Sequence, residues 1–485
     1  MTANSSSYVI ESGAALVWQG DVPTVRHNVS VVVEGDSIVE VREGRVPGRV
    51  ERLDASDQLL LPGFISGHTH VSVGSYTRGL IEGGGSTEFL HTVVDDLPDE
   101  ELDDLMSFNL LELVRSGVTT VVNQDHNVRR ARSYVRVATR WGCRGYPSGM
   151  VPGIHRLFPI WHRQTDDVLT DSVADTLREI EENLQFGLEC NHAENDRIRP
   201  NMAPHATDTH TPETMAAVID AAKKLGNGIH IHLAQSQEET RRVREMWGQT
   251  PVQWAESLGL YEVPVLAAHM DGVDLEVDLP ILARNNVYYS TCPTGGGPGG
   301  RPQPWPEMLA AGVSSGPAID THTNDMIENV KLAVFHGQAR YELLRDTSPV
   351  PLQRPTIEDA VNGATHVIAD VLGRPDLGRI TVGAKADLVG IDVSGPLVGS
   401  GAFPPKPLWN LLYASGKNVK NVITDGVHQV KNGQFSVDDE AEVLRRGGEV
   451  VAKIYRAVEK ASYLQQSAGT AGHPWGGKFT PLVEH

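Results

Sequence analysis

From about residue 61 to residue 374, short apolar runs alternate with longer amphipathic stretches, and this alternation limits the possible folds more than any other feature. The amphipathic stretches include ELDDLMSFNLLELVRSG and PETMAAVIDAAKKLG. Apolar strands that alternate with helices favour parallel β/α units. About 300 residues of such units suit a (β/α)₈ TIM barrel, so we predict an α/β fold with this barrel over residues 63–374. The apolar runs are LLLPGFIS, TTVVN, GIHIHL, VPVLAAH, NVYYST and SSGPAID.

Both ends of the chain have a different pattern, that of β-strands joined by tight turns. A Glu-Gly-Asp turn at 34–36 separates two β-type segments, and the Asp-Gly and Asn-Gly pairs at 425–426 and 432–433 are strong hairpin signals. We predict that the two ends together build a small β-sandwich. Its expected parts are residues 1–62 and 375–436, and a C-terminal helix and tail follow over residues 437–485.

Composition narrows the class of partner. The 42 basic and 62 acidic residues give a net charge of -20, which disfavours nucleic acid or an anionic membrane as a partner. The cysteines, Cys143, Cys190 and Cys292, are too few and too scattered for a disulfide framework or a cysteine metal cluster. No signal peptide is visible and no apolar run reaches the ~20 residues of a membrane span. We therefore expect a cytoplasmic protein with a small-molecule ligand, assembled as a homodimer or higher homo-oligomer.

The segment GFISGHTH places two histidines two residues apart at the end of a predicted strand. Side chains at i and i+2 of a strand point the same way, so His68 and His70 project from one face. Both imidazoles could reach one divalent metal at about 2.0–2.1 Å. An isolated pair of this kind is equally compatible with two hydrogen-bonding loop histidines.

Three further polar residues, His232, His269 and Asp320, also stand at the ends of predicted strands. The C-terminal ends of barrel strands meet at one face, where active sites lie. Nitrogen and oxygen donors without cysteine fit Zn²⁺, Fe²⁺, Mn²⁺ or Co²⁺. We predict one divalent metal ion per subunit, with Zn²⁺ as the first choice.

Together these motifs resemble the amidohydrolase superfamily, and most of all its branch of triazine hydrolases, chlorohydrolases and cytosine or guanine deaminases. The resemblance covers about residues 30–435. It implies a metal-carrying barrel, a β-sandwich built from both chain ends, and hydrolysis by a metal-bound hydroxide. The motifs that carry it are LLLPGFISGHTH, TRG, RSGVTTVV, APHATDTHTPE, HIHLAQSQEE, LAAHMDGVD, STCPTG, AIDTHTNDM and LGRITVGAKADLV.

The resemblance also assigns roles, residue by residue. It gives the metal ligands as His68, His70, His232 and Asp320. Asp320 is further expected to take the proton from the attacking water, and His269 to stabilise charge in the transition state. His205 matches a position that lines the substrate pocket. We expect His230 to be a second-layer or core histidine, and His322 and Asn324, just past Asp320, to orient the substrate.

Gln235 departs from the pattern of the deaminases in this branch. They have a glutamate three residues after the third metal histidine, and it carries protons to the ring nitrogen and the leaving ammonia. An amide has no titratable proton, and such proton transfer is worth ~10²–10⁴-fold in rate. The nearby Glu238 and Glu239 are expected to face solvent on the following helix. Gln235 is therefore predicted to contact substrate without moving protons.

Two further departures lie near the predicted mouth of the barrel. Thr291 precedes Cys-Pro where the family often has histidine, and Asn123 replaces the usual aspartate. Both indicate an altered pocket.

These features favour a metal-dependent hydrolase that cleaves an amide, urea or carbamate-like C–N (or C–S) bond of a small, fairly apolar molecule. The phenylurea and thiocarbamate (molinate) hydrolases of the branch have also lost the glutamate. The alternative is an aminohydrolase acting on a triazine, pyrimidine or purine, with another acid compensating for Gln235. A third hypothesis, a metal-free barrel that serves as a scaffold, is disfavoured because every ligand position holds a competent donor.

Overall fold

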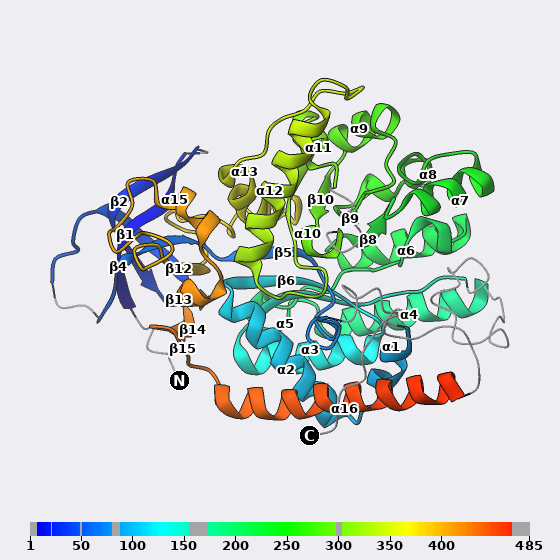
Figure 1. Cartoon of the computed structure of the whole chain (residues 1–485), viewed down its shortest axis with the longest axis horizontal. Helices are drawn as coiled ribbons and strands as arrows, with labels where there is room; N and C mark the ends of the chain where they lie inside the picture. The colour runs from blue at the N-terminus through cyan, green and yellow to red at the C-terminus, as the bar shows by residue number, and fades with distance from the viewer. Residues whose placement is uncertain are drawn as a thin grey trace.

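The computed structural model of the protein describes residues 7–20, 22–48, 51–79, 88–154, 173–296 and 303–467. The strands from the two chain ends lie together on the left of Figure 1, and the parallel strands with their helices form the rest of the molecule. The predicted tail after residue 467 lies outside the described residues.

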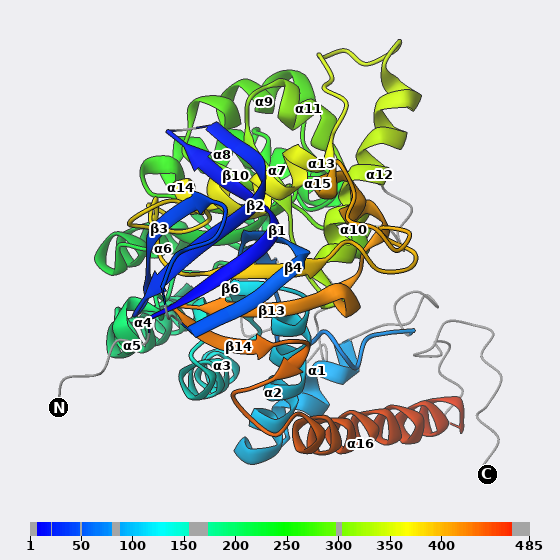
Figure 2. The ribbon, with the colours of Figure 1, turned by 90° about the vertical axis from the view of Figure 1, so that its left-hand side faces the viewer.

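Strands from both ends of the chain share one eight-stranded sheet, in the order β15-β14-β13-β12-β4-β1-β2-β3 (Figure 2). The two ends meet where β4 pairs antiparallel with β12, with Leu59 opposite Ile391. The strands are β1 (Ser7–Gln19), β2 (Val22–Glu34), β3 (Ser37–Glu43), β4 (Glu51–Pro62), β12 (Leu388–Asp392), β13 (Val419–Thr424), β14 (Val427–Lys431) and β15 (Gln434–Phe435).

The hairpins expected from the turn signals are confirmed. Strands β2 and β3 are antiparallel, with Glu34 opposite Ser37. Between β13 and β14, Asp425 and Gly426 have φ values of 53° and 78°. Both residues of a two-residue type I′ turn need positive φ, which Asp-Gly adopts at low cost.

Two further sheets are parallel. One has the order β5-β6-β7 and the other β11-β10-β9-β8. Each of these strands except β11 is buried along its whole length, as expected for strands covered on both faces. The strands are β5 (Phe64–Thr69), β6 (Val118–Asp125), β7 (Arg144–Gly149), β8 (Ile229–Leu233), β9 (Val265–His269), β10 (Val287–Thr291) and β11 (Ser314–Pro317).

Isolated parallel bridges connect these two sheets. The segment 198–206 lies between β7 and β8, because Val151 pairs with Pro204 and Ala206 pairs with His232. On the other side, Thr69 after β5 pairs with Asp320 after β11. These parallel strands, alternating with helices, give a TIM-barrel-type α/β fold.

Helices alternate with the parallel strands along the chain. They are α1 (Glu88–Asp95), α2 (Asp99–Arg115), α3 (Val128–Trp141), α4 (Val173–Cys190), α6 (Pro212–Leu225), α7 (Gln237–Trp247), α8 (Pro251–Ser257), α9 (Leu275–Arg284), α11 (Trp305–Ala310), α12 (Met326–Leu344), α13 (Ile357–Asn362) and α14 (Ile368–Val371). In the part of the chain that the structure describes, no helix combines the length and apolarity required to cross a membrane.

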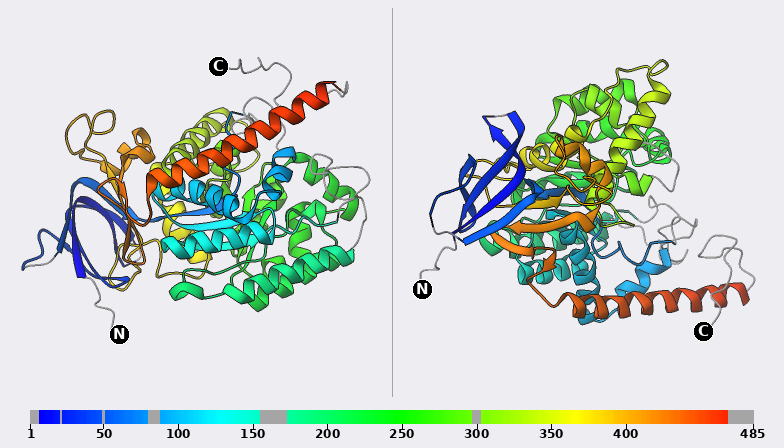
Figure 3. Two further views of the ribbon diagram at one scale, coloured as in Figure 1. Left: turned by 90° about the horizontal axis from the view of Figure 1, so that it is seen from below. Right: turned by 60° about the vertical axis from the view of Figure 1, so that its left-hand side comes forward.

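The last helix, α16 (Glu440–Ser467), runs along the same side of the molecule as α2 (Figure 3). Its Val450 and Ile454 belong to a buried cluster that also holds Val73 and Tyr76, from the loop after β5. The C-terminal helix thus packs against the segment that immediately follows His70.

A buried ion-pair network attaches the terminal sheet to the parallel strands. The Arg144 guanidinium, at the start of β7, donates to Asp387 at 2.9 and 3.2 Å and to Asp425 at 3.0 Å. All three side chains are almost fully buried, so each charge depends on the others for compensation. The terminal sheet therefore lies at the N-terminal end of β7, and the C-terminal strand ends are left for the site.

Candidate metal centre

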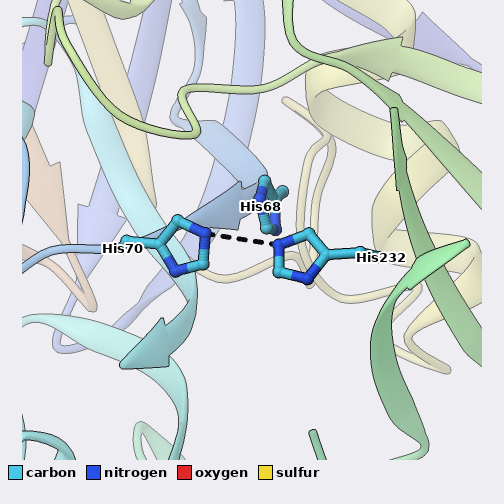
Figure 4. A group of neighbouring side chains, drawn as sticks. All are labelled: His68, His70 and His232. Carbon is cyan, nitrogen blue, oxygen red and sulfur yellow. Dashed lines mark hydrogen bonds between the residues drawn. The ribbon is translucent and has the colours of Figure 1, made fainter. Parts of the chain in front are cut away.

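Four strand ends bring His68, His70, His232, His269 and Asp320 together. His68 lies in β5 and His70 directly follows it, while the other three stand at or just past the ends of β8, β9 and β11. Ligand atoms of His68, His70 and His232 all lie within 4.8 Å of one another, as do those of His68, His269 and Asp320. Figure 4 shows the first three rings converging on one point.

The distances indicate a compact centre with the Nε2 atoms turned inward. His232 Nε2 lies 3.4 Å from His70 Nε2. Oδ1 of Asp320 lies 3.4 Å from His68 Nε2 and 3.6 Å from His70 Nε2. The backbone holds this carboxylate in place, because the Asp320 N–H donates to the His68 carbonyl and the Asp320 carbonyl accepts from the His70 N–H.

The opposite nitrogen of each of the three converging rings is fixed by a hydrogen bond. His70 Nδ1 donates to the Gln124 carbonyl at 2.5 Å, and His232 Nδ1 donates to the His205 carbonyl at 2.9 Å. His68 Nδ1 is bonded to His230 Nε2 at 2.7 Å. A proton held on Nδ1 leaves the Nε2 lone pair available, which is how histidine ligands are oriented in metal sites.

The arrangement fits a divalent metal. His68 Nε2 is buried and has no hydrogen-bond partner among the described residues, and such an orphaned atom is costly unless something binds it. Three imidazole nitrogens and one carboxylate oxygen form a donor set suited to zinc and other first-row divalent ions.

Burial and the contacts within the cluster together favour the protonation states that a metal site requires. It lowers the pKa of His68 to about 3 and takes the pKa of His232 well below its ordinary value. Burial alone would raise the pKa of Asp320, but the His68 imidazole, 3.4 Å away, and the nearby His269 and His70 hold it well below the usual range. Neutral imidazoles and an ionised carboxylate are the forms that bind a cation.

The strand ends that carry these residues have unusual backbone conformations. Ala234, His269, Asp320 and His322 have φ values of 47°, 75°, 62° and 79°. Residues other than glycine seldom adopt positive φ, and such strain concentrates at functional sites. The chain therefore bends sharply after β8, β9 and β11, next to the side chains that these strands deliver.

Two of the residues assigned to the site from the sequence, His269 and His205, lie beside His232. The His269 and His205 rings have their centroids 5.3 Å from that of His232, and the His269 ring is nearly parallel to it, at 12°. His322 and Asn324 line a cavity of about 710 Å³, whose walls also include Thr294 and Arg78 but none of the residues that form the centre.

Asp320 is closely packed against the loop after β10. A Cβ added at Gly295 would lie 2.1 Å from Asp320 Oδ2, so only glycine allows this approach. The spacing of the metal motifs does not reveal this contact.

The expectation for Glu239 is wrong. Glu238 is exposed, but Glu239 is buried on the first turn of α7 and accepts a hydrogen bond from the Gln235 backbone N–H at 2.6 Å. The sequence does carry a signal for this position. Ser236 caps α7, and a glutamate three residues after a serine cap faces back toward the preceding loop.

The two unusual residues near the strand ends form hydrogen bonds to other segments of the chain. Asn123 accepts from the Val71 N–H at 3.0 Å and donates to Asp125 at 2.7 Å, which fixes the chain just after His70. Thr291 donates its hydroxyl to the Gln303 side chain at 2.7 Å.

Comparison with known proteins gives one family and a consistent set of relatives. The model of the family described as "Amidohydrolase family" matches residues 59–428. A 5-methylthioadenosine/S-adenosylhomocysteine deaminase from Pelotomaculum thermopropionicum is 28% identical over 458 residues, covering 90% of this chain and 96% of the relative. A deaminase of the same name from Moorella thermoacetica is 29% identical over 401 residues, covering 81% and 86%.

Solved structures agree on the fold. An adenosine deaminase from Xanthomonas campestris with bound zinc superposes with a TM-score of 0.74 at 21% identity, covering 93% of this chain and 98% of the other. The zinc complex of atrazine chlorohydrolase from Arthrobacter aurescens TC1 superposes with a TM-score of 0.74 at 18% identity, covering 92% and 100%.

The His68–His230 bond yields a prediction. His230→Phe keeps a ring of similar size but removes the partner of His68 Nδ1, so zinc affinity should fall by about 10- to 100-fold. Competition with a chromogenic chelator measures this change.

His210→Phe is the matched control, because His210 is also buried but bonds Thr214 and the Val151 carbonyl instead. Equal zinc affinities in the two variants would contradict the orienting role of His230.

Proposed function

The chain belongs to the amidohydrolase family, and on that premise we propose that it hydrolyses an amide, urea or carbamate-like C–N (or C–S) bond of a small, fairly apolar molecule. Family and relatives make it a metal-dependent hydrolase acting on C–N bonds rather than a metal-free scaffold. The observation that supports cleavage of an amide, urea or carbamate-like bond is Gln235. At this position the deaminases that the sequence resembles have a glutamate that transfers protons.

His68, His70, His232 and Asp320 would hold one divalent ion, with zinc as the first choice. When bound, such an ion lowers the pKa of water toward neutrality and polarises the bond under attack.

Asp320 is the proposed general base. Its pKa is held low by the surrounding imidazoles, so it is ionised and can accept the proton of the attacking water. The same carboxyl then returns that proton to the leaving amine. One residue thus serves both steps, and no second acid at position 235 is needed.

His269 is the proposed partner of the oxygen that gains charge. Its ring stacks nearly parallel to that of His232 and lies 5.1 Å from that of His68, measured between centroids, so it borders the same point as the ligands. A hydrogen bond that strengthens as charge develops contributes directly to rate.

Gln235, His205, His322 and Asn324 are the proposed substrate contacts. Gln235 is partly exposed at the end of β8, where its amide can accept from and donate to a substrate without titrating. The Nε2 atom of His322 is buried without a hydrogen-bond partner among the described residues, which suits a polar substrate group.

A second candidate is deamination of a nitrogen heterocycle. The names of the curated relatives, 5-methylthioadenosine/S-adenosylhomocysteine deaminases, favour it. Glu239 does not supply the missing acid, since both of its oxygens are engaged by loop donors. Product analysis separates the candidates, because ammonia indicates deamination and a larger amine or a thiol indicates the first proposal.

We further propose that the parallel segments close into one (β/α)₈ barrel and that the terminal sheet folds into a β-sandwich. The isolated bridges on both sides of the two parallel sheets support closure. A homodimer or higher homo-oligomer in the cytoplasm is the proposed state of the protein.

Asp320→Asn tests the general base. The amide cannot take a proton, so turnover of any substrate found by screening amides, ureas and carbamates should fall by at least about 10²-fold, while the far-UV circular dichroism stays unchanged. Asp278→Asn is the control, because Asp278 is also buried but accepts a hydrogen bond from Thr250 instead. Turnover by Asp320→Asn at the wild-type rate would refute the mechanism.

Gln235→Glu tests whether the lack of a titratable group at position 235 prevents deamination. Restoring a titratable group where deaminases have one should produce measurable ammonia release from amino-triazines, pyrimidines or adenosines. Hydrolysis of the screened C–N substrate should persist. Strong ammonia release by the wild-type protein itself would favour the second candidate instead.

A further inference from the structure

We infer that Glu239 is a positioning residue that locks together the two loops on either side of His232, and so fixes the substrate face of the centre. The inference rests on the proposed function. It assigns a role to a side chain outside the predicted ligand and substrate-contact sets.

The Glu239 carboxylate connects two loops that are distant in sequence. Its Oε2 accepts from the Gln235 N–H at 2.6 Å. Its Oε1 accepts from the Thr207 N–H at 3.2 Å and from the Thr207 hydroxyl. These three donors meet at one carboxyl group, which therefore joins the two loops.

Both loops lead directly to His232. Gln235 follows it by three residues along the end of β8. Thr207 follows His205 by two residues, and the His205 carbonyl accepts from both the backbone N–H and Nδ1 of His232, at 3.1 and 2.9 Å. The contacts form a closed circuit that runs from His232 through His205 and Thr207 to Glu239, and back through Gln235.

The local structure explains why the carboxylate can reach both loops. Ser236 caps α7 and accepts from the Glu239 N–H at 3.2 Å, which places Glu239 on the first helical turn and directs it toward the preceding loop. Glu238, its neighbour, lies on the exposed side and pairs with Arg241.

Burying an acidic side chain costs free energy, and the hydrogen bonds of Glu239 offset that cost. Burial, and to a lesser extent the charge of buried Asp208, raise the pKa of Glu239 to about 8. Arg242 lies 3.3 Å from Asp208 and offsets part of this charge. An alkyl side chain would avoid the burial penalty but could not accept from either loop.

The two loops that Glu239 joins carry residues with different proposed roles around His232. His205 contributes its carbonyl to the orientation of a proposed ligand, and its ring faces that ligand at 5.3 Å between centroids. Gln235 contributes its side chain to the substrate. Because Glu239 fixes the loops of both residues, it couples the geometry of the metal ligand to that of the substrate contact.

Glu239→Gln is the direct test, and Glu238→Gln is its matched control on the same helical turn. The new amide can still accept a hydrogen bond from Thr207, but its NH₂ group is a donor that faces another donor, the Gln235 N–H. Hydrogen–deuterium exchange should be faster by about tenfold in segments 203–209 and 233–238 of Glu239→Gln, and unchanged in Glu238→Gln.

Titration of the same proteins with zinc alone gives the second readout. The dissociation constant for zinc should rise by about tenfold in Glu239→Gln and stay at the wild-type value in Glu238→Gln. A lower melting temperature with unchanged zinc affinity would reveal a role in stability only, and would overturn the inference. Unchanged exchange in both segments would also overturn it.

Thr207→Val provides a second variant should Glu239→Gln fail to fold. It removes only the hydroxyl donor, so exchange in segment 203–209 should rise and zinc affinity should fall, by less than tenfold. No change in either would overturn the inference. Absence of zinc binding in the wild-type protein would defeat the proposed function, whereas faster exchange confined to the Glu239 and Thr207 variants would still support the loop junction.

Discussion

The structure depends on buried imidazoles whose rings are oriented by hydrogen bonds at Nδ1. His68, His70 and His232 each commit Nδ1 to a neighbour and turn Nε2 toward a common point. Burial keeps His68 and His232 unprotonated, while the imidazoles around Asp320 keep its carboxylate ionised. This pairing of neutral donors with one anion creates a site for a cation, and the proposed chemistry follows from it.

Contacts that stabilise the fold and residues that form the site lie at opposite ends of the parallel strands. Arg144 and its two aspartates attach the terminal sheet at the start of β7, where a fully buried charge network can be satisfied. The opposite strand ends are left to bend through positive φ at Ala234, His269 and Asp320. In this architecture one end of the parallel strands typically stabilises the fold, and the other end carries the functional site.

Much of this was readable in the sequence because it depends on local patterns. Apolar runs ending in His or Asp predict strand ends that meet, and the structure places those side chains together. Strand β7 was missed because RGYPSG contains arginine, proline and glycine rather than an apolar run. Its strand conformation comes from pairing with β6, a tertiary effect that overrides local propensity.

Other features could not be derived because they are made by contacts across the chain. The segment 198–206 joins the strands only through isolated bridges. For Glu239, the Ser236 cap signals that the side chain turns toward the preceding loop, but its partner Thr207, 32 positions away, is a contact across the chain that local spacing does not reveal. The hydrogen bond between His68 and His230 likewise spans 162 positions of sequence.

The choice between the two proposed functions rests on the amide at position 235, but both reactions would require the same cation. Anomalous diffraction at the zinc edge, from crystals grown with zinc, tests that requirement most directly. The account predicts a single strong peak at about 2.0–2.2 Å from the Nε2 atoms of His68, His70 and His232 and from an Asp320 oxygen. A peak bound by other residues, or no peak between these four side chains, would contradict it.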